Sequence, residues 1–158
     1  MYVHHMVTLY APDPVHASPQ AIMEVCLCHH TRRAARAISR LFDEALTPIA
    51  LKVSQFNILA AIGAHDSAST ADISRLLALD RTTLSRNLKP LRKAGYVSSG
   101  GGAGRRPDTL VLTYAGRTIL SEATPLWQQA QGQLTQLLGT SLSGAVLQTL
   151  ENVARILT

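Results

Sequence analysis

Aromatic residues, cysteines and long apolar runs are scarce in this sequence, and each shortage excludes a class of protein. Phe, Trp and Tyr together make up only 4% of the residues, too few for an aromatic sugar cleft or a platform for stacked bases. No apolar run approaches the ~20 residues that a membrane span needs, so we expect no membrane partner. Two cysteines cannot supply the disulfide framework of a small secreted domain.

The ends and the composition of the chain favour an intracellular globular protein. The first 14 residues have neither the basic segment nor the apolar core of a secretory signal, so we expect a cytoplasmic location. The 158 residues, 46% of them hydrophobic, suit one domain or one domain with a dimerising extension. Only 16% are charged, which argues against intrinsic disorder.

Positive charge is concentrated in the middle of the chain. The whole chain has a formal net charge of +5, yet residues 81–117 contain eight basic residues and a single acid, Asp108, a net +7. Residues 125–158 contain one acid, Glu151, and one base, Arg155. A basic middle beside a nearly uncharged end predicts a polyanion-binding unit joined to a self-associating unit.

Apolar periodicity and capping signals predict a mainly α-helical fold with a small β-hairpin wing. The sequence predicts a winged helix-turn-helix flanked by long dimerisation helices. We expect a flexible arm over residues 1–17, a dimerisation helix within 18–50, the winged unit over 51–113 and dimerisation helices over 114–158. We expect helices over residues 19–46, 81–94, 114–138 and 142–157. We also expect a helix from the N-cap Ser54 to Gly63, and one from an N-cap at Thr70 or Ser69 to about residue 77. Strands are expected over residues 96–98 and 109–113.

The predicted helix over 81–94 has two distinct faces. At ~100° per residue, Leu84, Leu88 and Leu91 fall on one side. Basic and hydroxyl side chains fall opposite, as in a recognition helix that enters the DNA major groove. A glycine-rich hairpin with two arginines follows, and its tip is suited to phosphates or the minor groove. The candidate DNA-binding residues are Thr70, Arg81, Thr82, Thr83, Ser85, Arg86, Lys89, Lys93, Arg105 and Arg106.

The run from Thr70 to Val97 strongly resembles the helix-turn-helix of the MarR (multiple antibiotic resistance regulator) family. The segments 112–117, 42–48 and 55–59 also resemble that family, and the likeness covers about residues 20–158. It implies an intertwined, largely helical homodimer whose first, fifth and sixth helices dimerise. It also implies a repressor that binds a palindromic operator in double-stranded DNA and is released by a small molecule or an oxidant. The chain departs from the family at the wing, where Gly104 stands in place of the acid that precedes the arginine.

The sequence offers two places for an effector. Cys26 and Cys28 lie beside His29 near the start of the first predicted helix, where a helix N-terminus favours a thiolate. The peroxide-sensing relatives of the MarR family place a cysteine near the start of the same helix. Buried structural thiols and a metal or metalloid site remain alternatives for the two cysteines. Trp127 either lines a small-molecule pocket or belongs to the core.

The sequence also bears on three classes of function other than a DNA-binding repressor. The chain has no nucleophile elbow, phosphate-cradling Gly-Lys-Ser/Thr loop or His-Glu-x-x-His motif, so we expect no enzyme, no cofactor and no dedicated metal site. A metal- or metalloid-responsive repressor that uses Cys26 and Cys28 with nearby histidines is one alternative. A winged-helix protein that contacts only other proteins is the other.

Overall fold

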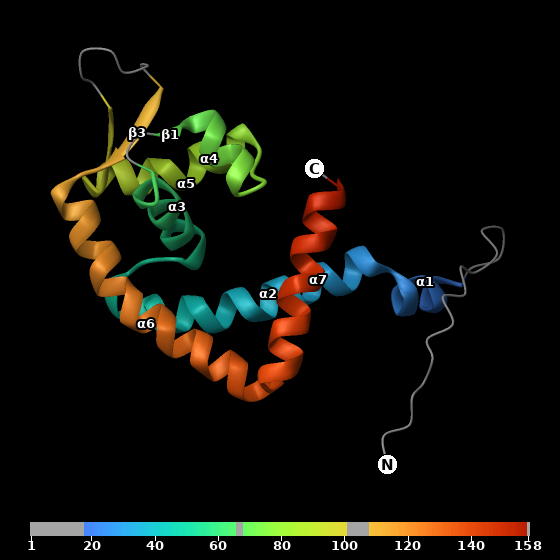
Figure 1. Cartoon of the computed structure of the whole chain (residues 1–158). Coiled ribbons are helices and arrows are strands. Elements are labelled where there is room, and N and C mark those ends of the chain that lie inside the picture. Colours follow the sequence, from blue (N-terminus) through green and yellow to red (C-terminus); the bar gives the residue numbers. More distant parts are fainter. Residues whose placement is uncertain (1–17, 66–67, 101–107, 158) are drawn as a thin grey trace. The chain divides into compact units, whose positions relative to one another are not determined.

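The computed structural model describes residues 18–65, 68–100 and 108–157 (Figure 1). The chain divides into two compact units, residues 1–38 and 39–158, which are described in turn. Helix α2 belongs to both, because the division falls within it.

The first unit contains a helix break that the sequence did not predict. Ser18 caps α1 (Pro19–Val25) by accepting the Ala21 N–H at 3.1 Å. Cys26 then adopts an extended conformation (φ −71°, ψ 103°), and α2 (Leu27–Leu46) begins. The expectation of one helix over 19–46 is therefore wrong. The thiol of Cys26 makes the break tolerable, since its Sγ accepts the His29 N–H at 3.4 Å and satisfies one open amide of the new helix.

The second unit contains the winged helix-turn-helix and two long helices. Its strands are β1 (Ala68–Ser69), β2 (Val97–Ser99) and β3 (Thr109–Leu112). They form one antiparallel sheet in the order β1-β3-β2, with Ser69 opposite Thr109 and Ser98 opposite Val111. The two-residue strand β1 lies where the sequence predicted only a loop. After the short 3-10 helix η1 (Thr47–Ile49), the elements are α3 (Val53–Gly63), β1 (Ala68–Ser69), α4 (Thr70–Leu76), α5 (Arg81–Lys93), β2 (Val97–Ser99), β3 (Thr109–Leu112), α6 (Tyr114–Leu138) and α7 (Thr140–Leu157).

Helix α3 begins earlier than the sequence suggested. Its N-cap is Lys52, and the Gln55 side chain accepts the Lys52 N–H at 2.9 Å. The Asp43 carboxylate accepts the Val53 N–H at 2.8 Å and lies 3.5 Å from the Lys52 Nζ. Ser54 was expected to cap this helix and does not, because an acid ten residues earlier satisfies the first amide instead.

One core joins the helix-turn-helix to the sheet and to α6. Its fully buried side chains include Ile58, Leu59, Ile73, Leu84 and Leu110, which come from α3, α4, α5 and β3. Figure 1 shows these elements gathered at one end of α6. Helix α5 is thus held on a rigid base rather than on a loop.

The junction of β3 with α6 depends on one glycine. Thr113 caps α6 by accepting the Gly116 N–H at 3.0 Å, and its hydroxyl donates to the Gly95 carbonyl at 2.6 Å. A Cβ on Gly116 would overlap the Tyr96 carbonyl oxygen, so only glycine fits this approach. Within the described residues, no single helix is long and apolar enough to cross a membrane, and segments 27–49 and 53–63 reach that length only together, across a 78° bend.

Candidate nucleic-acid interface

Helix α5 begins at a well-formed carboxylate cap. The Asp80 side chain accepts the Thr83 N–H at 2.9 Å and the Thr83 hydroxyl at 2.6 Å. The Thr83 hydroxyl, followed by the Thr83 N–H, holds the pKa of Asp80 below its ordinary value near 3.8. Thr83 is half-buried and its hydroxyl is engaged in the cap, so its placement favours positioning the helix start over reading bases.

The two faces of α5 separate as the sequence predicts. Leu84, Leu88 and Leu91 are at most 3% exposed, and they pack α5 against the core. Asn87 extends this contact, since its Oδ1 accepts the Ser54 hydroxyl of α3 at 3.0 Å. The opposite face is exposed along the whole helix and carries Thr82, Arg86, Lys89 and Lys93.

A polar cavity of about 400 Å³ lies along the edge of α5 that faces α4. It brings together three of the predicted DNA-binding residues, Thr70, Arg81 and Ser85. Arg92, which the sequence reasoning missed, also lines this cavity, and so does Asp108. Arg92 lies eleven residues after Arg81, which is ~20° away around the helix, so a helical projection of α5 was the signal that could have found it.

The cavity wall contains a hydroxyl without a partner. Ser74 lines the cavity, and its Oγ is buried with no hydrogen-bond partner among the described residues. At the neighbouring helix start, the Ser69 hydroxyl accepts the Asp72 N–H at 3.1 Å and donates to the Asp72 carboxylate at 2.7 Å. Ser69, rather than Thr70, therefore caps α4, which leaves Thr70 at the cavity.

The tip of the wing lies outside the described residues. Arg105 and Arg106 fall within 101–107, so they stay a sequence-based prediction. The base of the wing is described: the Gly100 N–H donates to the Thr109 carbonyl at 2.7 Å, and β2 pairs with β3.

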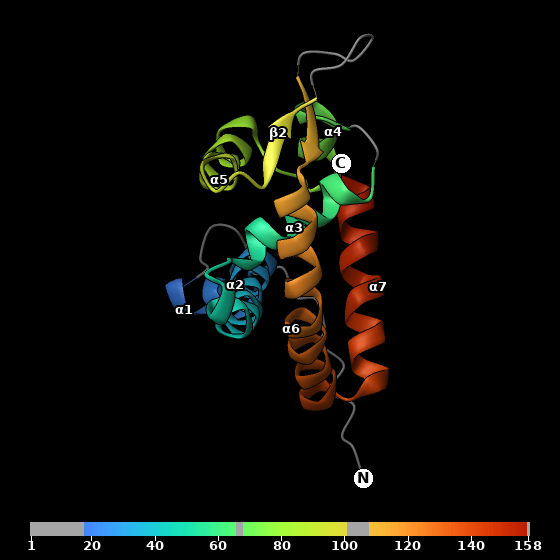
Figure 2. The same ribbon diagram turned by 90° about the vertical axis from the view of Figure 1, so that its left-hand side faces the viewer.

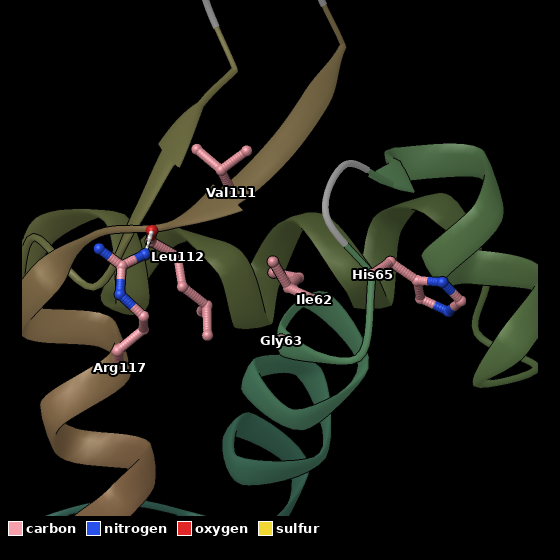
Figure 3. Close-up of a pocket in the computed structure, with 6 residues that line it drawn as sticks. All are labelled: Ile62, Gly63, His65, Val111, Leu112 and Arg117. Carbon is pink, nitrogen blue, oxygen red and sulfur yellow. Dashed lines mark hydrogen bonds between the residues drawn. The ribbon is translucent and has the colours of Figure 1, made fainter.

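A smaller cavity lies at the base of the wing. It measures about 190 Å³ and lies between the end of α3, β3 and the start of α6 (Figure 3). The Arg117 Nη1 donates to the Leu112 carbonyl at 2.9 Å, so this guanidinium braces the junction of β3 with α6. Figure 3 shows His65 pointing away from the other five labelled residues.

The predicted effector residues belong to different units: Cys26, Cys28 and His29 to the first, and Trp127 to the second. Cys26 is half-buried at the helix break and Cys28 is exposed. The His29 and His30 rings meet edge to face with centroids 5.2 Å apart. No group of three or more His, Cys, Asp or Glu residues in the described segments is arranged to hold a metal ion.

Trp127, the remaining predicted effector residue, stacks on Phe56 with ring centroids 6.0 Å apart and packs against the core. A nearby cavity of about 260 Å³ between α2 and α6 is lined by Leu41, Glu44, Ala45, Gln129 and Gln133. These residues all belong to the second unit. The packing of Trp127 supports a core role, and the cavity is a separate place for a small molecule.

Helix α7 leaves several apolar side chains exposed. It follows α6 at Gly139 and packs against that helix, as Figure 2 shows. No residue of α7 within 140–157 is buried. The exposed apolar side chains of α7 are Leu142, Leu147, Leu150, Val153, Ile156 and Leu157.

Comparison with known sequences places the winged unit in a family. A sequence profile described as the MarR family matches residues 51–106. An HTH-type transcriptional regulator of Bacillus subtilis strain 168, YwoH, is 29% identical over 87 residues, which is 55% of this chain and 64% of YwoH. The match thus spans less than two thirds of that relative.

Solved structures extend the likeness to most of the chain. The Mycobacterium tuberculosis transcriptional regulator MosR, in complex with DNA, is 33% identical, with a TM-score of 0.72 over 83% of this chain and 95% of MosR. The transcriptional repressor CouR, bound to p-coumaroyl-CoA, is 27% identical, with a TM-score of 0.75 over 85% of this chain and 95% of CouR.

Proposed function

We propose, from the premise that this chain belongs to the MarR family of transcriptional regulators, that it is a cytoplasmic repressor that binds a palindromic DNA operator as a homodimer. The family consists of regulators rather than enzymes, and the relative MosR was solved with DNA bound. The observation that carries the proposal is the exposed basic face of α5 above a buried leucine face. A helix fixed in this way can enter a major groove without losing its own packing.

The proposed contacts divide into two kinds. Arg86 and Thr82 lie on the open face of α5, where side chains reach base edges in a bound groove. Arg81 and Arg92 lie at the cavity beside α4, where they are suited to phosphates of the flanking backbone. Lys93 follows Pro90 near the end of α5 and is assigned to phosphate as well.

A homodimer is the arrangement that the exposed stripe of α7 supports. Leu142, Leu150, Val153 and Leu157 are each 47% exposed or more and fall on one side of the helix at ~100° per residue. A second copy that covers this stripe removes apolar surface from water. It also supplies the second half-site reader that specific binding of a palindrome needs.

The assignment of Arg86 to base reading is tested by two separate substitutions, one at Arg86 on the open face of α5 and one at Arg92 in the cavity. Arg86→Ala is expected to weaken operator binding by roughly 1–3 kcal/mol and to relax the preference at one base position. Arg92→Ala is expected to weaken binding to operator and random duplex alike and to lower the salt slope by about one. Arg105→Ala on the wing is expected to behave like Arg92→Ala.

The measurement is fluorescence anisotropy on operator and random duplex at several salt concentrations. Arg155→Ala, on the C-terminal helix α7, is the matched control and should leave both affinities unchanged, because Arg155 is assigned to no DNA contact. Equal losses for Arg86→Ala on operator and random DNA would contradict base reading by Arg86. Absence of salt-dependent duplex binding by the wild-type protein would contradict the DNA-binding function itself.

For release from DNA, the helix break favours Cys26 as the responsive thiol. Its sulfur already accepts the His29 N–H at the start of α2, so a change at this sulfur acts directly on the start of that helix. In the proposed step the Cys26 sulfur attacks the terminal oxygen of an organic hydroperoxide, and the S–O bond forms as the O–O bond breaks. The OH group passes to sulfur, and the alkoxide leaves as the alcohol by taking up the proton that the thiol gives up. The sulfenic acid then disturbs the cap of α2, a helix assigned to the dimer.

The release hypothesis is tested by operator affinity before and after one equivalent of organic hydroperoxide. The wild-type protein and Cys28→Ser are expected to lose affinity, whereas Cys26→Ser is expected to stay bound. If Cys26→Ser responds like the wild type, Cys26 is not the sensor. The cavity at Gln129 and Gln133 is then the better place for an effector, as the relative CouR was solved with p-coumaroyl-CoA.

A further inference from the structure

Two polar side chains connect the first turn of α3 to α5. The Ser54 hydroxyl donates to the Asn87 Oδ1 at 3.0 Å, and the Asn87 Nδ2 donates to the Thr83 carbonyl at 2.9 Å. The Asn87 amide is thus held by α3 through its oxygen and by the first turn of α5 through its nitrogen. All three residues lie within the unit 39–158. We call Ser54 and Asn87 together the helix link.

The α3 end of the helix link is held in place. The Val53 N–H donates to the Asp43 carboxylate at 2.8 Å, and the same carboxylate lies 3.5 Å from the Lys52 Nζ. Because Lys52 is the N-cap of α3, Ser54 has no capping role and its hydroxyl is available to Asn87. The helix link therefore joins α5 to a helix start that is itself fixed by the end of α2.

The α5 end of the helix link is held by the cap of that helix. The Asp80 carboxylate accepts the Thr83 N–H at 2.9 Å and the Thr83 hydroxyl at 2.6 Å, while the Thr83 carbonyl accepts the Asn87 side chain. The N-cap of α5 and its first two turns are thus tied together. A rotation of α5 about its axis would carry Asn87 away from Ser54, so the helix link opposes that rotation.

The buried leucines of α5 do not fix its rotation as closely. Leu84, Leu88 and Leu91 are at most 3% exposed, but the burial of apolar surface has no preferred direction, whereas a hydrogen bond weakens as its angle departs from linear. A rotation of about 10° moves an atom at the surface of a helix, about 5–6 Å from the axis, by roughly 1 Å. Binding groups need to be held within about 0.5 Å of their working position. The rotation of α5 therefore decides where Arg86, next to Asn87 on the open face, meets a base.

An asparagine side chain has the chemistry that this contact needs. An amide accepts a hydroxyl through its oxygen while it donates to a carbonyl through its nitrogen, and an ionised aspartate cannot do both. Asparagine is a weak helix former, and a hydrogen bond to the exposed Ser54 contributes little net stability. Helix stability thus gives no reason for an asparagine at position 87, whereas the positioning of α5 does.

We propose that Ser54 and Asn87 are positioning residues for sequence-specific recognition, which set the rotation of α5 without contacting DNA themselves. This inference rests on the proposed function, because it assumes that α5 reads base edges in a duplex. Contacts to phosphates carry no base identity and dominate non-specific binding. Loss of the helix link should therefore lower the affinity for the operator and spare the affinity for random duplex.

The test compares the full-length wild type with Ser54→Ala and Asn87→Ala by fluorescence anisotropy at several salt concentrations. A duplex that the wild type selects from a random-sequence pool serves as the operator, and an unselected duplex serves as random DNA. A good base contact gives roughly 5- to 150-fold discrimination, so each variant is expected to bind the operator about tenfold more weakly. The affinity for random duplex and the salt slope on both duplexes should stay at their wild-type values.

Further variants serve as controls for the helix link. Ser54→Thr keeps the hydroxyl and should keep the wild-type ratio of operator affinity to random affinity. Asn57→Ala changes an exposed asparagine of α3 outside the helix link and should also keep that ratio. The double variant Ser54→Ala/Asn87→Ala should lose no more of the ratio than Asn87→Ala does, because both changes remove the same hydrogen bond.

The ratio of the two affinities separates positioning from folding. A partly unfolded variant loses affinity for both duplexes by the same factor and its thermal midpoint falls, while the ratio stays at the wild-type value. An unchanged ratio for Ser54→Ala and Asn87→Ala would therefore overturn the proposal. A salt slope lower by about 0.9 on both duplexes would mean that the substituted side chain contacts a phosphate, which would also overturn it. A wild type that binds no duplex would instead contradict the proposed function.

Discussion

Helices α5 and α7 are both amphipathic, but of the two only α5 has its apolar side chains buried in the described chain. Its three leucines are at most 3% exposed, the Thr83 N–H in its first turn is capped by Asp80, and Asn87 links it to α3. The apolar stripe of α7 has no such cover, and Leu157 is 78% exposed. The charged helix α5 thus has its apolar face buried within the described chain, whereas the apolar stripe of the nearly uncharged helix α7 stays exposed.

This difference separates two kinds of function in one small chain. Helix α5 is ready to contact a ligand because its shape and rotation are fixed by its own core. Helix α7 exposes apolar surface that is costly in water, so its stability depends on what covers it. Changes in α5 should therefore act on the folded chain itself, and changes in α7 should act on association.

The largest expected effect comes from the buried face of α5. Leu84→Ala is expected to lower the free energy of unfolding by about 2–5 kcal/mol, because a fully buried leucine leaves a cavity. Leu76→Ala on α4 is the matched control, since Leu76 is 57% exposed, and it should cost little. Chemical denaturation of both variants at one protein concentration measures the difference, and equal losses would contradict the assignment of Leu84 to the core.

The next effect concerns the apolar stripe of α7. Leu150→Glu is expected to weaken the dimer at least tenfold, about 1.4 kcal/mol, because it places a charge in the proposed contact. Leu147→Glu is the control, because Leu147 lies ~100° away from the stripe and is already 61% exposed. Sedimentation equilibrium reads the dissociation constant, and a stable wild-type monomer at micromolar concentration would contradict the dimer altogether.

The sequence predicted the elements with strong periodicity and missed those set by single contacts. The predicted bounds of α6, 114–138, match the structure, because its apolar repeat and the Thr113 cap agree. The break at Cys26 and the Lys52 cap of α3 were missed, since a thiol and a distant carboxylate satisfy backbone amides there. Strand β1 was missed because a two-residue strand has no period to detect.

The candidate interface shows the same limit. The exposed face of α5 follows from helical geometry and was predicted. The cavity that joins Arg81 to Arg92 and Asp108 depends on how α4 and the start of β3 pack beside α5, and no local pattern specifies that packing. Whether the individual side chains contact DNA stays a prediction.

A smaller effect is expected at the Ser74 hydroxyl, a buried side-chain group that has no hydrogen-bond partner among the described residues. Ser74→Ala should raise the free energy of unfolding by up to about 1 kcal/mol, because a buried hydroxyl without a partner is costly and alanine removes it. Ser85→Ala, an exposed serine of the same cavity, is the control and should have no effect on stability. Thermal denaturation compares the variants, and destabilisation by Ser74→Ala would mean that the hydroxyl has a partner in solution.

The smallest effect should appear only in acid, at the cap that α5 has and α7 lacks. Helix α7 has no acid in its first turn, whereas the hydrogen bonds from Thr83 lower the pKa of Asp80 from its ordinary value near 3.8. A carboxyl whose pKa is lower in the folded state stabilises that state fully above the unfolded pKa. This contribution is lost as the pH falls from about 3.8 through the lowered value.

Asp80→Asn keeps a capping oxygen but cannot titrate, so its free energy of unfolding should match the wild type at pH 7 and fall less steeply below pH ~4. Asp72→Asn makes the same comparison at the capping carboxylate of α4, because the Ser69 hydroxyl also lowers the pKa of Asp72. Urea denaturation from pH 7 to pH 3 measures the slopes, and identical acid profiles for the wild type and Asp80→Asn would contradict a stabilising role for the ionised cap.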